Sequence, residues 1–117
     1  MILQNFANLQ KGKVFSFPKD HGRHNDFKTE WWHLTADLYD QERQRHRAQL
    51  TFFRNYVTQL RDVHNSPQLF FAHAALYEYD TKCFHFEERL SLQRPHIVYS
   101  DKNLNLHHTG WIMKMTE

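Results

Sequence analysis

A chain of 117 residues, of which 40% are hydrophobic and 15% aromatic, is long enough for one hydrophobic core and too short for two. Its 15 basic and 13 acidic residues are mixed along the chain, which excludes the concentrated basic surface that nucleic acid binding requires. The single cysteine, Cys83, excludes an internal disulfide. The opening MILQNFANLQKGKVFSF lacks the pattern of a signal peptide, and no apolar stretch is long enough to predict a membrane span.

Residues 1–26 show no sustained hydrophobic period, and the loop-forming residues of FPKDHGRHND predict an irregular segment. The first clear period follows in EWWHLTADLY (30–39), where apolar residues alternate with more polar ones. This pattern predicts a half-buried strand, because successive side chains of a strand point to opposite faces. One predicted face carries Trp32, Leu34, Ala36 and Leu38, and the other carries Trp31, His33, Thr35, Asp37 and Tyr39.

The next segments continue the strand pattern. DQERQR (40–45) has the length of a hairpin connection, and the β-branched and aromatic residues of 47–57 predict a second strand paired with the first. Residues 58–67 break the pattern and predict a loop or a short helical turn. Residues 68–80 predict a third strand whose two faces are both largely apolar, which indicates that it lies between a core and another layer.

The last third of the chain is less regular. CFHFEERLSL (83–92) alternates and then loses its period, so that a helical turn over 87–92 competes with a strand. Residues 95–100 are a short apolar run, and 103–115 alternate again. About six strands joined by short links are typical of an antiparallel meander, whereas a closed barrel that holds a ligand takes about eight. We predict a single all-β domain over 1–117, an antiparallel meander that forms part of a β-barrel and is incomplete in this chain.

Three segments, FPKDHGRHNDFKTEWWHLTADLYD, QLTFFR and FFAHAALYEYDTKCFHFEERL, resemble in order and spacing the opening of the AttH / carotenoid 1,2-hydratase family. That family includes hydroxyneurosporene synthase and lipocalin-like proteins described as predicted secreted hydrolases. The resemblance implies a lipocalin-like barrel of calycin type, the first of two such domains in a longer chain. It also implies a periplasmic or secreted location. A second lipocalin-like domain, or another chain, is the partner expected to complete the barrel.

The tryptophan pair supplies the leading candidates for ligand contact. Trp31 and Trp32 either pack as core residues or line a lumen, because alternate residues of every barrel strand face inward. The more polar face, with Trp31, suits a pocket that holds a few polar groups among aromatic ones, and the apolar face suits a packed interface. We expect the Trp31 face to meet the ligand.

Further candidates lie on neighbouring strands. Gln49 and His73 interrupt apolar stretches, where each is either a hydrogen-bonded core residue or a polar point in a pocket. Arg54 follows two phenylalanines and is expected to meet either the polar end of a ligand or an acidic residue at the barrel rim. The predicted ligand-binding residues are Trp31, Trp32, His33, Gln49, Phe53, Arg54 and His73.

We predict that the protein binds an apolar or amphipathic small molecule in a lipocalin-like lumen, without a cofactor. The alternative that the resemblance implies is an enzyme that adds water to an isoprenoid double bond by acid catalysis. Such a reaction needs a carboxylic acid kept protonated by apolar surroundings and an electron-rich wall for the cation. Glu30 and Asp37 are the candidate acids, although a surface position at a strand start also accounts for Glu30. Whether the chain is an enzyme stays open.

A metal site is a further possibility in the loop before the first strand. Asp20, His21 and His24, together with Glu30 and His33, offer carboxylates and imidazoles that zinc accepts. A loop whose Asp and His side chains bond to nearby backbone groups accounts for the same residues without a metal. Because the segment has no cysteine ligand, we expect the second arrangement and no metal.

Overall fold

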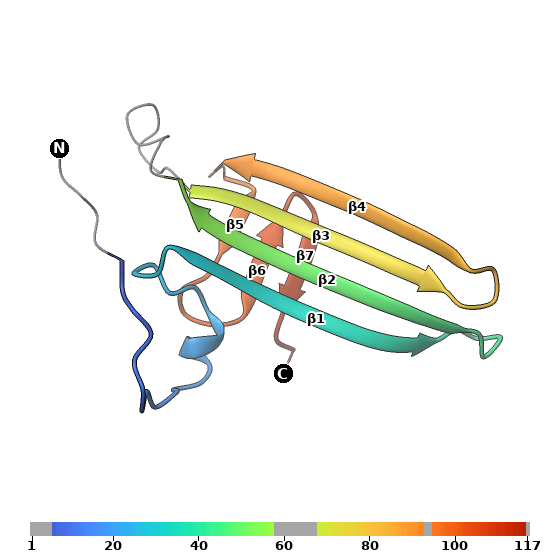
Figure 1. The fold of residues 1–117 in the computed structure, drawn as a ribbon, viewed down its shortest axis with the longest axis horizontal. Coiled ribbons are helices and arrows are strands. Elements are labelled where there is room, and N and C mark those ends of the chain that lie inside the picture. Colours follow the sequence, from blue (N-terminus) through green and yellow to red (C-terminus); the bar gives the residue numbers. More distant parts are fainter. Residues whose placement is uncertain (1–5, 58–67, 93–94, 117) are drawn as a thin grey trace.

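Two antiparallel sheets make up the protein in the computed structural model, which describes residues 6–57, 68–92 and 95–116 (Figure 1). The large sheet has four strands in chain order, β1 (Thr29–Tyr39), β2 (Arg45–Tyr56), β3 (Gln68–Glu78) and β4 (Cys83–Leu92). The small sheet has three, β5 (Ile97–Tyr99), β6 (Asn105–His108) and β7 (Trp111–Lys114). The predicted all-β class and the meander are confirmed, and the described strands do not close into a barrel.

In the last third of the chain the structure excludes one of two open alternatives and corrects one prediction. The competing helical turn over 87–92 is a continuation of β4, because this stretch keeps its pairing with β3 as far as Leu92. The single alternating segment 103–115 is a hairpin of β6 and β7. Its two-residue turn has positive φ angles of 48° at Thr109 and 91° at Gly110, the backbone that a tight hairpin turn requires. The loop or helical turn predicted over 58–67 lies outside the described residues.

The large sheet has two faces that differ in what covers them. We call the side toward the small sheet the inner face and the opposite side the outer face. The register aligns Trp32 with Phe52 and Phe52 with Ala72, so that the apolar sets of neighbouring strands share the inner face. The predicted division of β1 into two faces is therefore seen. Large exposed side chains on the outer face are Trp31, Tyr39, Phe84, Phe86 and Leu90.

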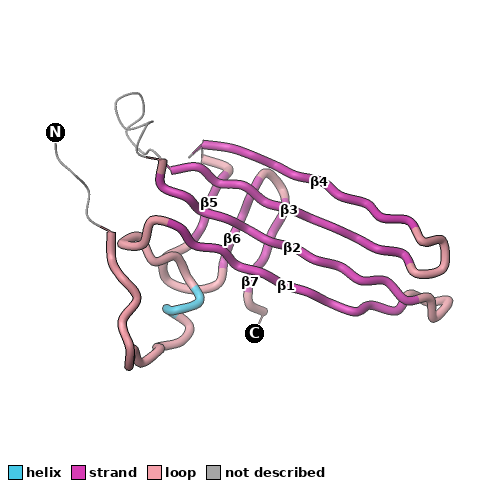
Figure 2. Tube along the Cα trace, viewed as in Figure 1, coloured by secondary structure: helices cyan, strands magenta, loops and turns pink. Residues whose placement is uncertain are grey.

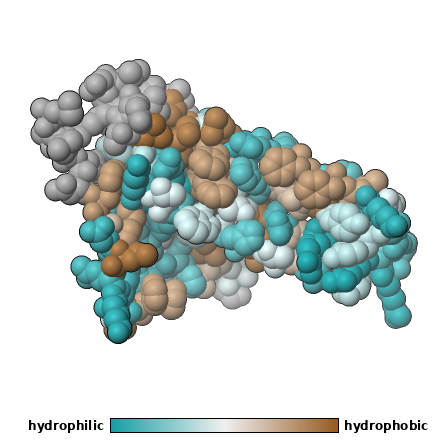
Figure 3. Space-filling view, in the orientation of Figure 1, coloured by the Kyte–Doolittle hydropathy of each residue, from teal (hydrophilic) through white to brown (hydrophobic). Residues whose placement is uncertain are grey.

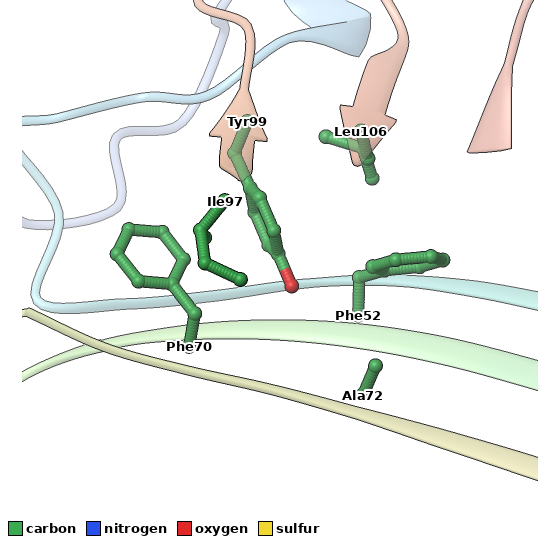
Figure 4. Packing of buried hydrophobic residues seen from close by; sticks show 6 residues of the cluster. All are labelled: Phe52, Phe70, Ala72, Ile97, Tyr99 and Leu106. Atoms are coloured by element: carbon green, nitrogen blue, oxygen red, sulfur yellow. The ribbon is translucent and has the colours of Figure 1, made fainter. Parts of the chain in front are cut away.

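The core lies between the sheets at one end of the inner face (Figure 4). Phe52 and Phe70 from the large sheet are fully buried against Tyr99 and Leu106 from the small sheet. The Tyr99 ring centroid lies 4.7 Å from that of Phe70 and 5.5 Å from that of Trp32. Burying several aromatic rings together is the main source of stability for a domain of this size.

This core decides which residue of the tryptophan pair faces the interior. Trp32, which packs against the core, faces the space between the sheets, whereas Trp31 points to the outer face and is 62% exposed. The Trp32 indole N–H donates a hydrogen bond to the His21 carbonyl at 2.9 Å. The apolar face of β1, and not the polar one, is thus the interior face, because the small sheet supplies an apolar layer for it to pack on.

The N-terminal segment joins the two sheets. Within residues 6–28 it contains one short helix, the 3-10 helix η1 (Lys19–His21), and is otherwise loop (Figure 2). At the buried Gly22 a Cβ atom would lie 2.9 Å from the Ser100 carbonyl oxygen, which leaves room only for glycine. The Arg23 backbone N–H donates to that same oxygen at 2.7 Å. The glycine of the DHGRH stretch therefore permits a close approach between this loop and the end of β5.

Candidate functional site

The small sheet covers only part of the inner face. Beyond the core the same face continues with Leu34, Leu50 and Leu76, which alternate across the strands with alanines. These residues line an open hollow of about 420 Å³, which we call the inner-face hollow. Its remaining inner-face lining consists of Ala36, Ala48, Ala74, His85 and Glu87.

The register explains why a hollow forms at this place. Ala36 pairs with Ala48, and Leu50 pairs with Ala74, so short side chains sit beside longer ones in adjacent rows. Short side chains cannot fill the layer above a sheet, and of Leu34, Leu50 and Leu76 only Leu50 is among the described residues that pack against the core. Leu34 is consequently 52% exposed although it belongs to the apolar face of β1.

Polar groups border the inner-face hollow along β4. The His85 ring Nε2 lies 3.1 Å from Glu78 Oε2, and this hydrogen bond lowers the pKa of Glu78. Glu87 lies 3.4 Å from Arg89, whose guanidinium stacks over the Trp111 ring at 4.2 Å from its centroid. One edge of the hollow therefore offers charged and hydrogen-bonding groups, while its floor is apolar.

A second hollow lies where the N-terminal segment meets the start of β1. Its volume is about 350 Å³. Phe15, Phe27 and Trp31 provide aromatic walls, and we call this space the aromatic hollow. It is completed by Leu9, Gln10, Lys13, His24, Thr29 and Glu30.

Charged side chains beside the aromatic hollow form a chain of hydrogen bonds centred on His24. Its Nδ1 lies 2.6 Å from Glu30 Oε1, and its Nε2 lies 2.8 Å from Asp20 Oδ1. The His24 backbone N–H also donates to Glu30 Oε2 at 2.8 Å. An imidazole between two carboxylates donates from both ring nitrogens when it carries its second proton.

Arg54 reaches this cluster from β2. Its side chain is 1% exposed, and its Nη2 donates to the carbonyl oxygens of His24 at 2.9 Å and Phe27 at 2.8 Å. The same nitrogen lies 3.3 Å from Glu30 Oε2. A buried guanidinium is tolerated when an opposite charge and several acceptors surround it. Arg54 therefore holds the loop before β1 against the sheet.

The cluster shifts the pKa values of two of its members, His24 and Asp20. Burial by itself lowers the pKa of His24, but the hydrogen bonds to Glu30 and Asp20 outweigh it, so the pKa is raised above its ordinary value. The Ser16 backbone N–H, followed by His24, lowers the pKa of Asp20 to about 2. His24 is consequently the proton-carrying partner of two carboxylates.

The predicted site residues do not gather in one pocket. Glu30 and Trp31 meet at the aromatic hollow, and Trp32 packs on the core. Gln49 borders the inner-face hollow, but its pairing with Thr35 and Ala75 assigns its side chain to the outer face. Arg54 lies in the buried cluster beneath the aromatic hollow.

The other predicted residues lie on the outer face. The His33 ring bonds to Thr51 Oγ1 at 2.7 Å. Phe53 stacks on Phe71 with ring centroids 4.6 Å apart, and the His73 ring lies 5.2 Å from Phe53. Figure 3 shows further hydrophobic side chains over β4. These contacts are cross-strand packing of the sheet.

Asp37, the second candidate acid, is also on the outer face. Its carboxylate lies 3.2 Å from Arg47 and 3.4 Å from Arg45. The hydrogen bond from Arg47, followed by that from Arg45, lowers the pKa of Asp37 below its ordinary value. A lowered pKa disfavours the protonated form, which a proton donor must keep.

Sequence reasoning missed the alanines of the inner-face hollow and the aromatic contribution of Phe15 and Phe27. The alanine signal was present, because three short residues occupy the apolar faces of three successive strands. No local pattern marks Phe15 or Phe27, since both come from the irregular segment. Of the residues considered for a metal, Asp20, His24 and Glu30 form the His24 cluster, whereas the His21 ring stacks on Phe17 and His33 lies on the outer face. Among the described residues, no group is arranged to hold a metal ion.

Within the described residues, no helix has the length and apolar character needed to span a bilayer.

Comparison with known proteins identifies relatives of the chain. The family model for AttH-like proteins matches residues 8–117. The crystal structure of a protein from Nitrosomonas europaea, described as a candidate AttH, is similar with a TM-score of 0.75 at 27% sequence identity. The match covers 92% of this chain and 32% of that chain, so this chain spans about a third of the other's length. No curated protein matches.

Proposed function

The chain belongs to the AttH-like family, and from that premise we propose that it binds an apolar or amphipathic small molecule in the inner-face hollow. The ligand lies with its apolar body on the rows of leucine and alanine and its polar end toward β4. A second lipocalin-like domain or another chain supplies the rest of the enclosing wall.

One observation carries this proposal, namely the uncovered apolar end of the inner face. Leucine side chains left in contact with solvent in a concave site are stabilised when an apolar ligand displaces the water around them. The volume of about 420 Å³ lies within the range of small-molecule sites. Polar side chains at one edge, His85 and Glu87, favour an amphipathic ligand over a purely apolar one.

The proposal is tested by a substitution that places a larger side chain in the inner-face hollow. Ala74→Phe adds a ring to the inner face, and Thr35→Phe adds the same ring to the outer face of the same sheet as a matched control. The neutral probe N-phenyl-1-naphthylamine, whose fluorescence rises in apolar surroundings, reports binding. We expect Ala74→Phe to weaken probe binding by about tenfold or more, because the ring occupies the ligand's space. Equal affinity in both variants would remove this site.

A second candidate function, hydration of an isoprenoid double bond, is favoured by the position of Glu30 beside Trp31 at the aromatic hollow. In this reaction the Glu30 carboxyl protonates one alkene carbon, and the indole face of Trp31 stabilises the cation. Water then adds to the second carbon and returns a proton to the carboxylate. Asp37 is the other proposed acid. Each of the two carboxylates already accepts hydrogen bonds from basic side chains, Glu30 from His24 and Arg54 and Asp37 from two arginines.

Mass spectrometry of lycopene incubated with the protein tests hydration, because the product gains one water. Glu30→Gln should abolish the product while ligand binding, followed by tryptophan fluorescence, persists. Asp37→Asn serves as the comparison variant. Unchanged product formation in both variants would remove both residues as the acid, and absence of product from the unmodified protein would leave binding as the function.

A further inference from the structure

The aromatic hollow is a separate site from the inner-face hollow. Phe15 and Phe27 come from the N-terminal segment and Trp31 from β1, and the inner-face hollow shares none of them. Phe15 is 63% exposed and Trp31 62% exposed, so their ring faces are accessible. Aromatic walls on several sides of a space of about 350 Å³ suit a planar or short-chain apolar body.

The carboxylates beside this hollow already have partners. Glu30 accepts hydrogen bonds from the His24 ring and backbone and from Arg54. Asp20 accepts from His24 Nε2 and from the Ser16 backbone N–H. The same bonds engage both ring nitrogens of His24. A cationic ligand would therefore have to displace an existing contact in order to reach either carboxylate.

Lys13 is placed differently. Its ammonium lies 3.5 Å from Asp20 Oδ1 and 5.5 Å from the Phe15 ring centroid, and its side chain is 43% exposed. An ammonium has three donors, and an ion pair at 3.5 Å is too long to be a strong hydrogen bond. Lys13 thus retains donor capacity at the rim of the aromatic hollow.

The local charge favours an anion. With His24 protonated, Lys13, His24 and Arg54 are three positive groups around the two carboxylates Asp20 and Glu30. A surplus positive charge beside an apolar wall attracts a molecule that combines an apolar body with one negative group. A single ammonium suits a carboxylate better than a phosphate, which is usually bound by several donors.

We propose that the aromatic hollow binds a small apolar carboxylate, whose ring or chain contacts Phe15, Phe27 and Trp31 and whose carboxylate meets Lys13. This site is independent of the proposed binding of a neutral or amphipathic molecule on the inner face. It also competes with the hydration alternative, which requires a neutral isoprenoid in the same hollow.

Calorimetric titration with 1-naphthoate and with its neutral analogue 1-naphthalenemethanol tests the charge preference. We expect 1-naphthoate to bind about tenfold more tightly than 1-naphthalenemethanol, because one charge-assisted hydrogen bond contributes about that factor to affinity. The difference should shrink as salt is added, because the rim is exposed. Equal binding of the two compounds would overturn the proposal, and preference for the neutral compound would overturn it in favour of the hydration site.

Variants locate the binding. Lys13→Gln should weaken 1-naphthoate binding by about tenfold and leave the neutral analogue unchanged, whereas the control Lys19→Gln, outside the hollow, should change neither. Trp31→Ala should weaken the binding of both compounds. Ala74→Phe, which fills the other hollow, should leave 1-naphthoate binding unchanged. The proposal fails if Lys13→Gln and Lys19→Gln act alike, or if Ala74→Phe abolishes 1-naphthoate binding.

Discussion

The two ends of the inner face have the same alternation of residues but differ in solvent exposure. At the covered end, Phe52 and Phe70 have no exposed surface, because Tyr99 and Leu106 of the small sheet pack on them. At the open end, Leu34 on the neighbouring strand keeps half its surface in solvent. The strands and their register are continuous between the two ends, so the difference arises from the layer above the sheet.

The alternation of a strand thus identifies its apolar face and does not determine what that face does. Under the small sheet the apolar face is core and contributes stability. Beyond it the same face is available to a ligand or to another layer. Along β1, β2 and β3 we therefore expect substitutions at the covered end to change mainly stability and substitutions at the open end to change mainly binding.

The largest expected difference between the ends is in stability. Phe52→Ala should lower the free energy of unfolding by about 4 kcal/mol, because it leaves a cavity in a packed core. Leu34→Ala should cost about 1 kcal/mol or less, since half of that side chain is already in water. Urea denaturation followed by circular dichroism measures both. Similar losses for the two variants would mean that the open end is also packed in solution.

The next effect concerns the join between the N-terminal segment and the covered end. Glu30→Gln removes the charge that faces buried Arg54 and protonated His24, and it should cost about 2 kcal/mol. Asp37→Asn on the exposed outer face is the matched control and should leave the denaturation midpoint unchanged, because exposed ion pairs contribute little. Equal midpoints for the two variants would contradict the role of the cluster.

The same join should depend on pH. The pKa of His24 is raised in the folded state, so its stabilisation is fully present below the unfolded pKa of 6.5 and is lost as the pH rises through the folded pKa. Burial lowers the pKa of His108 in the core, which gives the opposite slope because the unfolded state binds that proton more readily. Subtracting the stability of a His24→Gln variant from that of the unmodified protein isolates His24.

We expect that stability difference to be largest near pH 6 and to shrink towards pH 8 or above. Chemical denaturation at a series of pH values measures it. A difference that stays constant across this range would show that His24 acts through packing and not through its charge.

The smallest expected effect is in the layer that covers the core. Thr109 adopts a positive φ of 48°, which a β-branched residue does not favour and asparagine tolerates well. Thr109→Asn should therefore raise stability by about 0.5 kcal/mol, as measured by thermal unfolding. Thr109→Val keeps the branch and should give no gain. Loss of stability in Thr109→Asn would indicate that the contact of Arg89 with Thr109 matters more than the turn.

Much of the fold could be predicted from local pattern. The alternation in 30–39 and the aromatic stretch 47–57 define β1 and β2, because a strand places successive side chains on opposite faces. The tail could not be resolved in the same way. The two-residue turn at Thr109 and Gly110 reverses the phase of the alternation, so that His108 and Trp111 share a face, and the segments on either side are too short to reveal this reversal in the sequence.

The candidate site was predictable only in part. Glu30 and Trp31 are adjacent in the sequence, but successive strand residues point to opposite faces, so their shared place at the aromatic hollow depends on the folded N-terminal segment. Their companions Lys13 and Phe15 come from a segment without a period, so only the folded loop brings them there. The His24 cluster was visible as a group of ligand-type side chains, but its pairing with Arg54 depends on contact across 30 residues of chain.

The sequence by itself determined the first three strands, the division of β1 into two faces and the resemblance on which the family assignment began, because these depend on local order along the chain. The tertiary structure alone decided that Trp32 is interior and Trp31 exposed, and which part of the apolar face is core. Those outcomes depend on where β5 to β7 pack, and packing between segments distant in the chain leaves no periodic trace in either segment.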